Sequence, residues 1–185
     1  MLQLMRRKLD CVVDLPGHAW AVVPLLEDSD AEVRYYVVQT LGKLEPAALA
    51  QHGAALVARL VDSNEDVREA AVLTLGKLEP AALAQHGAAL AAKLEHSDAG
   101  VRYYAAQTLG KLEPAALAQH GAAVVARLED SDWEVRKAAV RTLGKLEAAA
   151  LAQHQQAIAK AAEEDEDEVV RAVAAKLLVK LRAGL

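Results

Sequence analysis

The sequence predicts an all-α solenoid, a right-handed superhelix of stacked antiparallel helix pairs, and three observations support this fold class. A block of 34 residues, 45–78, returns almost unchanged at 79–112 and 113–146. The hydrophobic residues, 54% of the chain, are mostly Ala, Leu and Val with no Phe, which suits close helix-on-helix packing. Apolar residues recur with helical spacing in the second half of each block. A fixed period of this size is typical of repeats that bury their apolar faces against their neighbours.

The same frame extends over the rest of the chain. Upstream, His18 and the segment Leu41-Gly42-Lys43-Leu44 stand at the matching positions. Downstream, the frame fits if one extra residue is allowed in an acidic stretch. The predicted organisation is an N-terminal capping helix at 1–10, repeat 1 at 11–44, repeat 2 at 45–78, repeat 3 at 79–112, repeat 4 at 113–146, and repeat 5 with the C-terminal cap at 147–185.

The two ends of the chain differ from the central repeats. Residues 1–10 place Leu2, Met5 and Leu9 on one side of a short amphipathic helix, which is predicted to cover repeat 1. In repeat 5, Gln155 replaces the Gly of the other repeats, and acidic residues accumulate. These changes are typical of a terminal repeat whose outer face meets water.

The first helix of each repeat is predicted to be interrupted. In repeat 2, Pro46 suits a first helical turn. His52-Gly53 then breaks the pattern, and Leu56 and Leu60 follow with helical spacing. We expect a short turn of helix, a break near Gly53, and a second piece of about two turns. The connection at 62–64 is short and predicts an antiparallel pair.

The second helix has a clearer pattern. In repeat 2 it is predicted to begin at 63–66, where Ser63 or Asn64 can cap free backbone amides, and to run to about Leu78. At about 100° per residue, one side of this helix is apolar and buried. That side holds Val67, Ala71, Leu75 and Leu78. The opposite, outward side holds Asp66, Glu69, Ala70, Leu73 and Lys77.

Composition and charge exclude several classes of partner and compartment. The net charge is −5, and no basic cluster is larger than Arg6-Arg7-Lys8, so a nucleic-acid backbone is a poor partner. The single Cys11 cannot form an internal disulfide, which favours an intracellular, cytoplasmic setting. The basic residues follow the apolar start, the reverse of a signal peptide, and no apolar stretch is long enough to span a membrane.

A Val-Arg pair, a Leu-Gly pair eight positions further on, and a preceding acidic turn recur along the chain. This pattern resembles short HEAT-like repeats of the kind found in phycobilin-lyase-type proteins and in artificial HEAT-like binding scaffolds. The resemblance implies that the acid before each second helix and the Arg within it form a polar ladder between repeats, with a weaker rung at Asn64. The implied pairs are Asp30, Asp98 and Asp132 with Arg34, Arg102 and Arg136.

Two other families share a 34-residue period and fit less well. Tetratricopeptide repeats need an early Trp and a Leu-Gly-x-x-Tyr pattern in the first helix, and neither is present. Repeats of the TAL-effector type read DNA bases through a Gly-containing loop, whereas the loops between helices here are acidic. We interpret the likeness of Ala-Gln-His-Gly to the end of a TAL repeat as chance.

Differences among the repeats predict where a partner binds. They concentrate on the two residues before each Val-Arg pair, the two after it, and one a turn later, which together form an outward stripe. All four Tyr and one of the two Trp lie on this stripe, and both residue types dominate binding hot spots. We call the predicted contact residues the second-helix surface: Glu32, Tyr35, Tyr36, Gln39, Asp66, Glu69, Leu73, Tyr103, Tyr104, Gln107, Trp133, Lys137 and Arg141.

These residues predict a non-enzymatic module that binds a protein or peptide, and the resemblance implies that second helices line the concave face of the superhelix. For Tyr36 and Tyr104, packing between repeats is an equal alternative. We expect a monomer. Other interpretations remain open: an engineered or duplicated scaffold with no natural ligand, a small-ligand chaperone similar to chromophore lyases, which requires a deep apolar pocket, and a nucleic-acid binder, which requires a basic stripe. Lys137 and Arg141 alone do not make such a stripe.

No metal, cofactor or catalytic site is predicted. Five of the six His recur at one place in the repeat, but stacked helices lie about 8–10 Å apart. Ligands of one zinc ion lie about 2 Å from the metal, so a structural role at the helix break is favoured. His96 is expected to be solvated. The acidic run 163–168 lacks the spacing and Gly of a calcium loop. No nucleophile is paired with a base, and no Gly-rich loop could hold phosphate.

Overall fold

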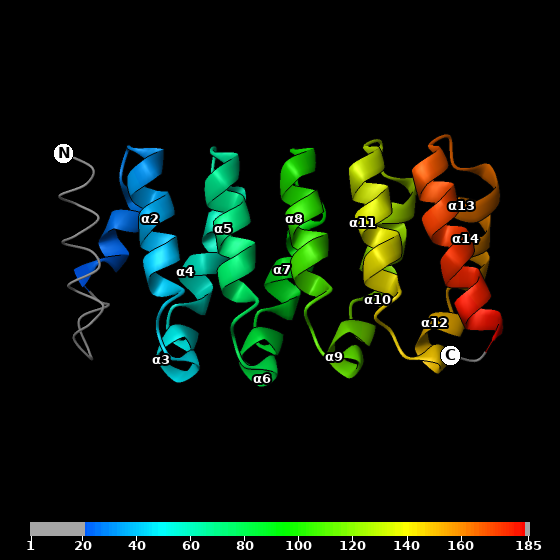
Figure 1. The fold of residues 1–185 in the computed structure, drawn as a ribbon, viewed down its shortest axis with the longest axis horizontal. Helices are drawn as coiled ribbons and strands as arrows, with labels where there is room; N and C mark the ends of the chain where they lie inside the picture. The colour runs from blue at the N-terminus through cyan, green and yellow to red at the C-terminus, as the bar shows by residue number, and fades with distance from the viewer. Residues whose placement is uncertain (1–20, 184–185) are drawn as a thin grey trace. The chain divides into compact units, whose positions relative to one another are not determined.

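The computed structural model describes residues 21–183, and every regular element in that range is helical. Within each of two compact units, helix pairs are stacked as expected for an α-solenoid (Figure 1). The chain divides into two compact units, Met1–His86 and Gly87–Leu185. The predicted capping helix at 1–10 lies outside the described residues. The predicted handedness of the superhelix and the repeat boundaries stay predictions.

In the first unit, α2 packs against both η2 and α5, and the helical pieces α4 and η3 pack against α5. Figure 1 shows α2 and α5 side by side with the short helices α3 and α6 at one end. The elements are η2 (Val23–Glu27), α2 (Ala31–Leu41), α3 (Pro46–Ala50), α4 (Gly53–Ala58), η3 (Arg59–Val61), α5 (Glu65–Leu75) and α6 (Pro80–Ala84).

The second unit repeats this arrangement. Helix α8 packs against α7 and α11, and α14 packs against α11 and α13. The elements are α7 (Gly87–Lys93), α8 (Ala99–Leu109), α9 (Pro114–Ala118), α10 (Gly121–Ala126), η4 (Arg127–Glu129), α11 (Trp133–Leu143), α12 (Ala148–Ala152), α13 (Gln155–Glu164) and α14 (Glu168–Arg182).

The local signals in the sequence position the helices. Asn64 caps α5 by accepting a hydrogen bond from the backbone N–H of Val67 at 3.1 Å, and the break near Gly53 separates α3 from α4. The predicted end near Leu78 is wrong, because α5 ends at Leu75. After it, the N–H groups of Lys77 and Leu78 donate to carbonyls three residues back. Such bonds tighten the last turn and redirect the chain.

The polar ladder forms, but with other acids than the resemblance implied. Both Nε and Nη2 of Arg34 donate to the carboxylate of Asp62, at 2.8 and 2.6 Å. Arg102 binds Asp130 and Arg136 binds Asp165 in the same bidentate manner. The acids predicted for this role cap the second helices instead, accepting hydrogen bonds from backbone N–H groups: Asp30, Asp98 and Asp132. Because an Asn oxygen caps equally well, Asn64 weakens no rung.

Each ladder Arg also holds the loop of its own repeat. Nη1 of Arg34 donates to the carbonyl oxygens of Asp28 at 2.8 Å and Ser29 at 3.2 Å. The Asp62 carboxylate accepts a further bond from the backbone N–H of Asn64. A buried charge is tolerated when it is paired and hydrogen-bonded in this way. One guanidinium therefore ties two successive inter-helix loops together.

His96 stands where the other repeats have a loop Asp, such as Asp62 or Asp130. Its Nδ1 accepts a hydrogen bond from the backbone N–H of Asp98 at 3.1 Å. The Asp130 carboxylate accepts the equivalent bond from the N–H of Asp132. The expectation that His96 is simply solvated is therefore incomplete, since its half-buried imidazole maintains the turn before α8.

Three of the recurrent His residues, His86, His120 and His154, pack against a Gly of the preceding repeat. A Cβ atom added to Gly53 would lie 2.2 Å from Nε2 of His86, and one added to Gly87 would lie 2.5 Å from Nε2 of His120. The imidazole therefore occupies the space that the missing side chain leaves. Gln155, at the matching position of repeat 5, is exposed. Among residues 21–183 no cluster of His, Cys, Asp and Glu could hold a metal ion.

Stability is expected to fall with acidification in two steps. Burial lowers the pKa of His52 below its ordinary 6.5. The unfolded chain thus takes up this proton first, and stability declines as the pH falls below 6.5. Burial raises the pKa of Asp62, but hydrogen bonds from Arg34 and Asn64 outweigh it and lower that pKa below 3.8, so a second decline begins there. Urea unfolding at a series of pH values measures both steps. The variant His52→Gln should reduce only the decline that begins near pH 6.5. If that decline is unchanged in the variant, His52 is not its cause.

Candidate binding groove on the second helices

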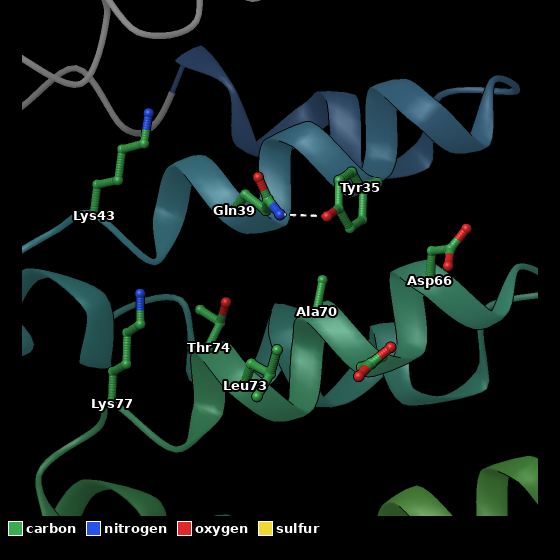
Figure 2. A pocket seen from close by; sticks show the side chains of 9 residues that line it. Tyr35, Gln39, Lys43, Asp66, Ala70, Leu73, Thr74 and Lys77 are labelled. Carbon is green, nitrogen blue, oxygen red and sulfur yellow. Dashed lines mark hydrogen bonds between the residues drawn. The ribbon is translucent and has the colours of Figure 1, made fainter.

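A groove of about 630 Å³ lies between the second helices α2 and α5 of the first unit (Figure 2). Its lining combines an aromatic ring, an exposed aliphatic side chain, two carboxylates and two ammonium groups. Repeat stacking sets its width, because α2 and α5 pack against each other along their buried sides. The lining residues are Tyr35, Gln39, Lys43, Asp66, Glu69, Ala70, Leu73, Thr74 and Lys77.

The middle of the groove is apolar. Leu73 projects from α5 with 59% of its surface exposed, next to the buried Ala70. From α2, Tyr35 packs edge-on against Tyr36, with ring centroids 5.4 Å apart, and its hydroxyl accepts a hydrogen bond from the side chain of Gln39. These contacts hold the phenol ring over the groove (Figure 2). An exposed Leu beside an oriented Tyr is a surface on which apolar side chains can be buried.

The two ends of the groove carry opposite charges. Asp66 lies in the first turn of α5, and Glu69 follows one turn later. Figure 2 shows Lys43 and Lys77 together at the opposite end of the groove from Asp66. Nζ of Lys77 donates to the carbonyl oxygen of Gly42 at 2.7 Å, which fixes its ammonium group at the C-terminal end of α2. Acids near helix N-termini and bases near helix C-termini are each stabilised by the helix dipole.

A second hollow of about 300 Å³ adjoins the first, between the N-terminal ends of α2 and α5. It shares Tyr35 and Asp66 with the larger groove and adds Glu32 and Tyr36. The two hollows bring together every residue of the second-helix surface that belongs to the first unit. Those residues are Glu32, Tyr35, Tyr36, Gln39, Asp66, Glu69 and Leu73.

Comparison among repeats did not single out Lys43, Thr74 or Lys77 as lining residues. The reason is that Lys and Thr recur at these positions in repeats 1–4, so variation carries no signal there. Lys77 was detectable only from its place on the outward side of the helix. Residues that stay the same for structural reasons can also line a binding surface.

In the second unit the same surface has a different character. Trp133 is 39% exposed, and Nζ of Lys137 lies 3.9 Å from the centre of its ring, in a cation–π contact. Arg141 is exposed on the same helix, and Tyr103 and Gln107 are half-buried on α8. Tyr104 is only 7% exposed. Its assignment to the contact surface is therefore corrected: Tyr104 is a packing residue, as the alternative interpretation had it.

The second unit also contains a hollow of about 360 Å³ between α10 and α13, away from the second helices. Its walls include Val125 and Leu128, together with the charged side chains of Glu129, Lys160 and Glu164. Nζ of Lys160 donates to Glu129 at 2.7 Å across it. None of the second-helix surface residues lines this hollow.

The sequence matches the family of HEAT repeats over residues 21–86 and 87–179, most of the chain. The chain belongs to the HEAT repeat family. This HEAT repeat protein matches no curated protein sequence. No helix within residues 21–183 is both long and apolar enough to cross a membrane.

Solved structures with 18–20% identity resemble this HEAT repeat protein in fold. An engineered protein matches with a TM-score of 0.64 and 20% identity, over 97% of this chain and 89% of its own. A designed armadillo repeat protein in complex with a (KR)4 peptide matches with a TM-score of 0.65 and 20% identity, over 97% and 92%. The CpcE–CpcF complex of phycocyanin lyase from Nostoc sp. matches with a TM-score of 0.65 and 18% identity, over 86% and 96%.

Proposed function

We propose that this HEAT repeat protein is a non-enzymatic module that binds another protein or a peptide through its second-helix surface. One observation carries the proposal. Of the ten positions in the first unit that vary most among the repeats, nine line two adjoining hollows between α2 and α5, the exception being Glu65. Variation concentrated in the lining of a groove is expected when the fold is kept constant and the contacts with a partner change.

The energetics of a repeat protein support this interpretation. Buried residues such as Val67, Ala71 and Leu75 form the contacts between helices and recur with little change along the chain. Stability is close to a sum over repeats and their interfaces, so outward positions can change without loss of the fold. The designed armadillo protein, which shares the fold, was solved with a peptide bound. Exposed Trp133 and the oriented ring of Tyr35 are suitable anchors for a partner.

The test is a pull-down from cell extract that compares the unmodified chain with a variant carrying Tyr35→Ala, Tyr103→Ala and Trp133→Ala. A specific partner is expected to lose at least about tenfold in affinity, because truncating an aromatic anchor commonly costs more than 1 kcal/mol. Mass spectrometry identifies the retained protein, and titration of the purified partner measures the affinity. Circular dichroism of both chains verifies that the helices are kept.

The matched control is a triple variant on the first helices, Gln51→Ala, Gln119→Ala and Lys160→Ala, whose side chains are all exposed. This control should retain the partner at the level of the unmodified chain. Equal retention by all three proteins would place the partner on another surface. The absence of any retained protein would support the alternative of a scaffold without a natural ligand.

A further inference from the structure

We propose that the groove between α2 and α5 binds a short extended peptide segment with a basic side chain at one end, apolar side chains in the middle and a carboxylate at the other end. This inference rests on the proposed function and specifies the chemistry of the partner at one place. Three features of the groove carry it: the separation of its charges, its apolar middle and its length.

The charge pattern selects the ends of the peptide. Asp66 and Glu69 are both exposed and stand at the N-terminal end of α5. The carboxylate of Glu32 lies in the adjoining hollow at the same end. A guanidinium or ammonium group placed there meets several carboxylates. At the opposite end, Lys43 and Lys77 present ammonium groups to a side-chain or terminal carboxylate (Figure 2). Complementary charges of this kind fix the register and orientation of a bound chain.

The apolar middle provides the contact area between these ends. Leu73 leaves 59% of its surface in water, and burying this apolar surface against a partner is favourable. Tyr35 lies across the groove on α2, opposite Ala70, which is one turn along α5 from Leu73 (Figure 2). A Leu or a similar side chain in the middle of the peptide would be enclosed between Leu73 and Tyr35. An entirely basic peptide lacks this contact and lacks a carboxylate for the lysines.

The length of the groove sets the spacing of the charges. Asp66 and Lys77 are eleven positions apart on α5 and the turn that follows it, which corresponds to roughly 16 Å at the helical rise. An extended peptide advances about 3.3 Å per residue. The basic and acidic residues of the peptide are therefore expected to be about five positions apart. A probe peptide that meets this spacing is acetyl-Arg-Ala-Leu-Ala-Leu-Glu-amide.

The repeats themselves supply substitutions that the fold tolerates. The position of Glu69 is occupied by Lys137 in α11, and the position of Leu73 is occupied by Gln39 in α2 and by Gln107 in α8. Glu69→Lys and Leu73→Gln thus place residues on α5 that the same helical position already accommodates. Each variant removes one feature of the groove without removing a buried contact.

The experiment is isothermal titration calorimetry of the full chain with the probe peptide at low ionic strength. We expect saturable binding that weakens as salt is added. Glu69→Lys and Leu73→Gln should each weaken it at least about fivefold, the scale of a contact worth about 1 kcal/mol. A peptide with Glu in place of the Arg should bind the unmodified chain at least about fivefold more weakly. The double variant Asp66→Lys, Glu69→Lys should bind the peptide with Glu in place of the Arg more tightly than the original probe.

Matched controls distinguish binding in the groove from general effects of surface charge and exposed apolar side chains. Glu163→Lys makes the same charge change at an exposed position of α13, and Val179→Gln removes an apolar side chain that is 67% exposed on α14. Both should bind the probe as the unmodified chain does. Equal effects of the control and groove variants, or no binding of the probe, would overturn the inference. A partner captured in the pull-down through Trp133 would still uphold the proposed function in that case.

Discussion

Replacing Arg102 with Ala is expected to lower the free energy of unfolding by about 3–5 kcal/mol, because a buried carboxylate loses its bidentate partner and keeps only a more distant cation, Arg127, at 3.7 Å. Nε and Nη2 of Arg102 bind the two carboxylate oxygens of Asp130 at 2.7 and 2.6 Å. Nη1 also donates to the carbonyl oxygens of His96 and Ser97, both at 2.9 Å. The side chain of Asp130 is only 3% exposed, so water has little access to it in the intact protein.

Urea unfolding followed by circular dichroism measures this loss, and Arg171→Ala is the matched control. Arg171 also donates to the carbonyls of its own loop, at Asp165 and Glu166, but within residues 21–183 it pairs with no carboxylate. Its removal should therefore cost about 1 kcal/mol, the net value of ordinary hydrogen bonds. Losses of similar size in the two variants would show that the Asp130 pair contributes little.

A double variant isolates the pair itself. Arg102→Ala with Asp130→Ala removes both charges, so no buried carboxylate is left unpaired. We expect it to be less destabilised than the sum of the two single variants, with an interaction energy of about 1–3 kcal/mol. Strict additivity of the single effects would contradict the bidentate arrangement.

The substitution Gly53→Ala is expected to destabilise the chain by about 1–3 kcal/mol, the usual cost of overpacking. The new methyl group would lie 2.2 Å from Nε2 of His86, so the imidazole or the helix must move. The penalty should decrease from Gly53 to Gly87 and Gly121, because the corresponding distances increase from 2.2 to 2.5 and 2.8 Å. Thermal or urea unfolding of the three variants measures this order.

Two further variants separate the steric effect from helix propensity. In a chain that already carries His86→Ala, the clash is absent. Adding Gly53→Ala to that chain should therefore lower the free energy of unfolding only slightly. Gly100→Ala, at a position where other second helices carry Glu32, Asp66 and Glu134, should instead stabilise the chain slightly, because Ala is a better helix former than Gly. Stabilisation by Gly53→Ala would show that His86 adjusts without cost.

The groove was only partly predictable, for identifiable reasons. Comparison among repeats found Tyr35, Asp66 and Leu73, because residues on the outward side of a helix can be inferred from its period alone. It could not separate Tyr104 from Tyr36, since the two occupy the same position in different repeats and their burial depends on the helices packed beside them. Tyr104 is buried, whereas Tyr36 is half-buried and lines a hollow.

The sequence determined the properties that depend on local chemistry: the 34-residue period, the break near Gly53, and the capping of α5 by Asn64. The break and the cap follow from residues only a few positions apart, and the period is visible directly as the repetition of the sequence. The tertiary structure decided which partners meet across repeats. The Arg34–Asp62 pair and the contact between His86 and Gly53 join residues 28 and 33 positions apart. Such contacts depend on how one helix pair is stacked on the next, and each repeat offers more than one acid that an Arg could reach.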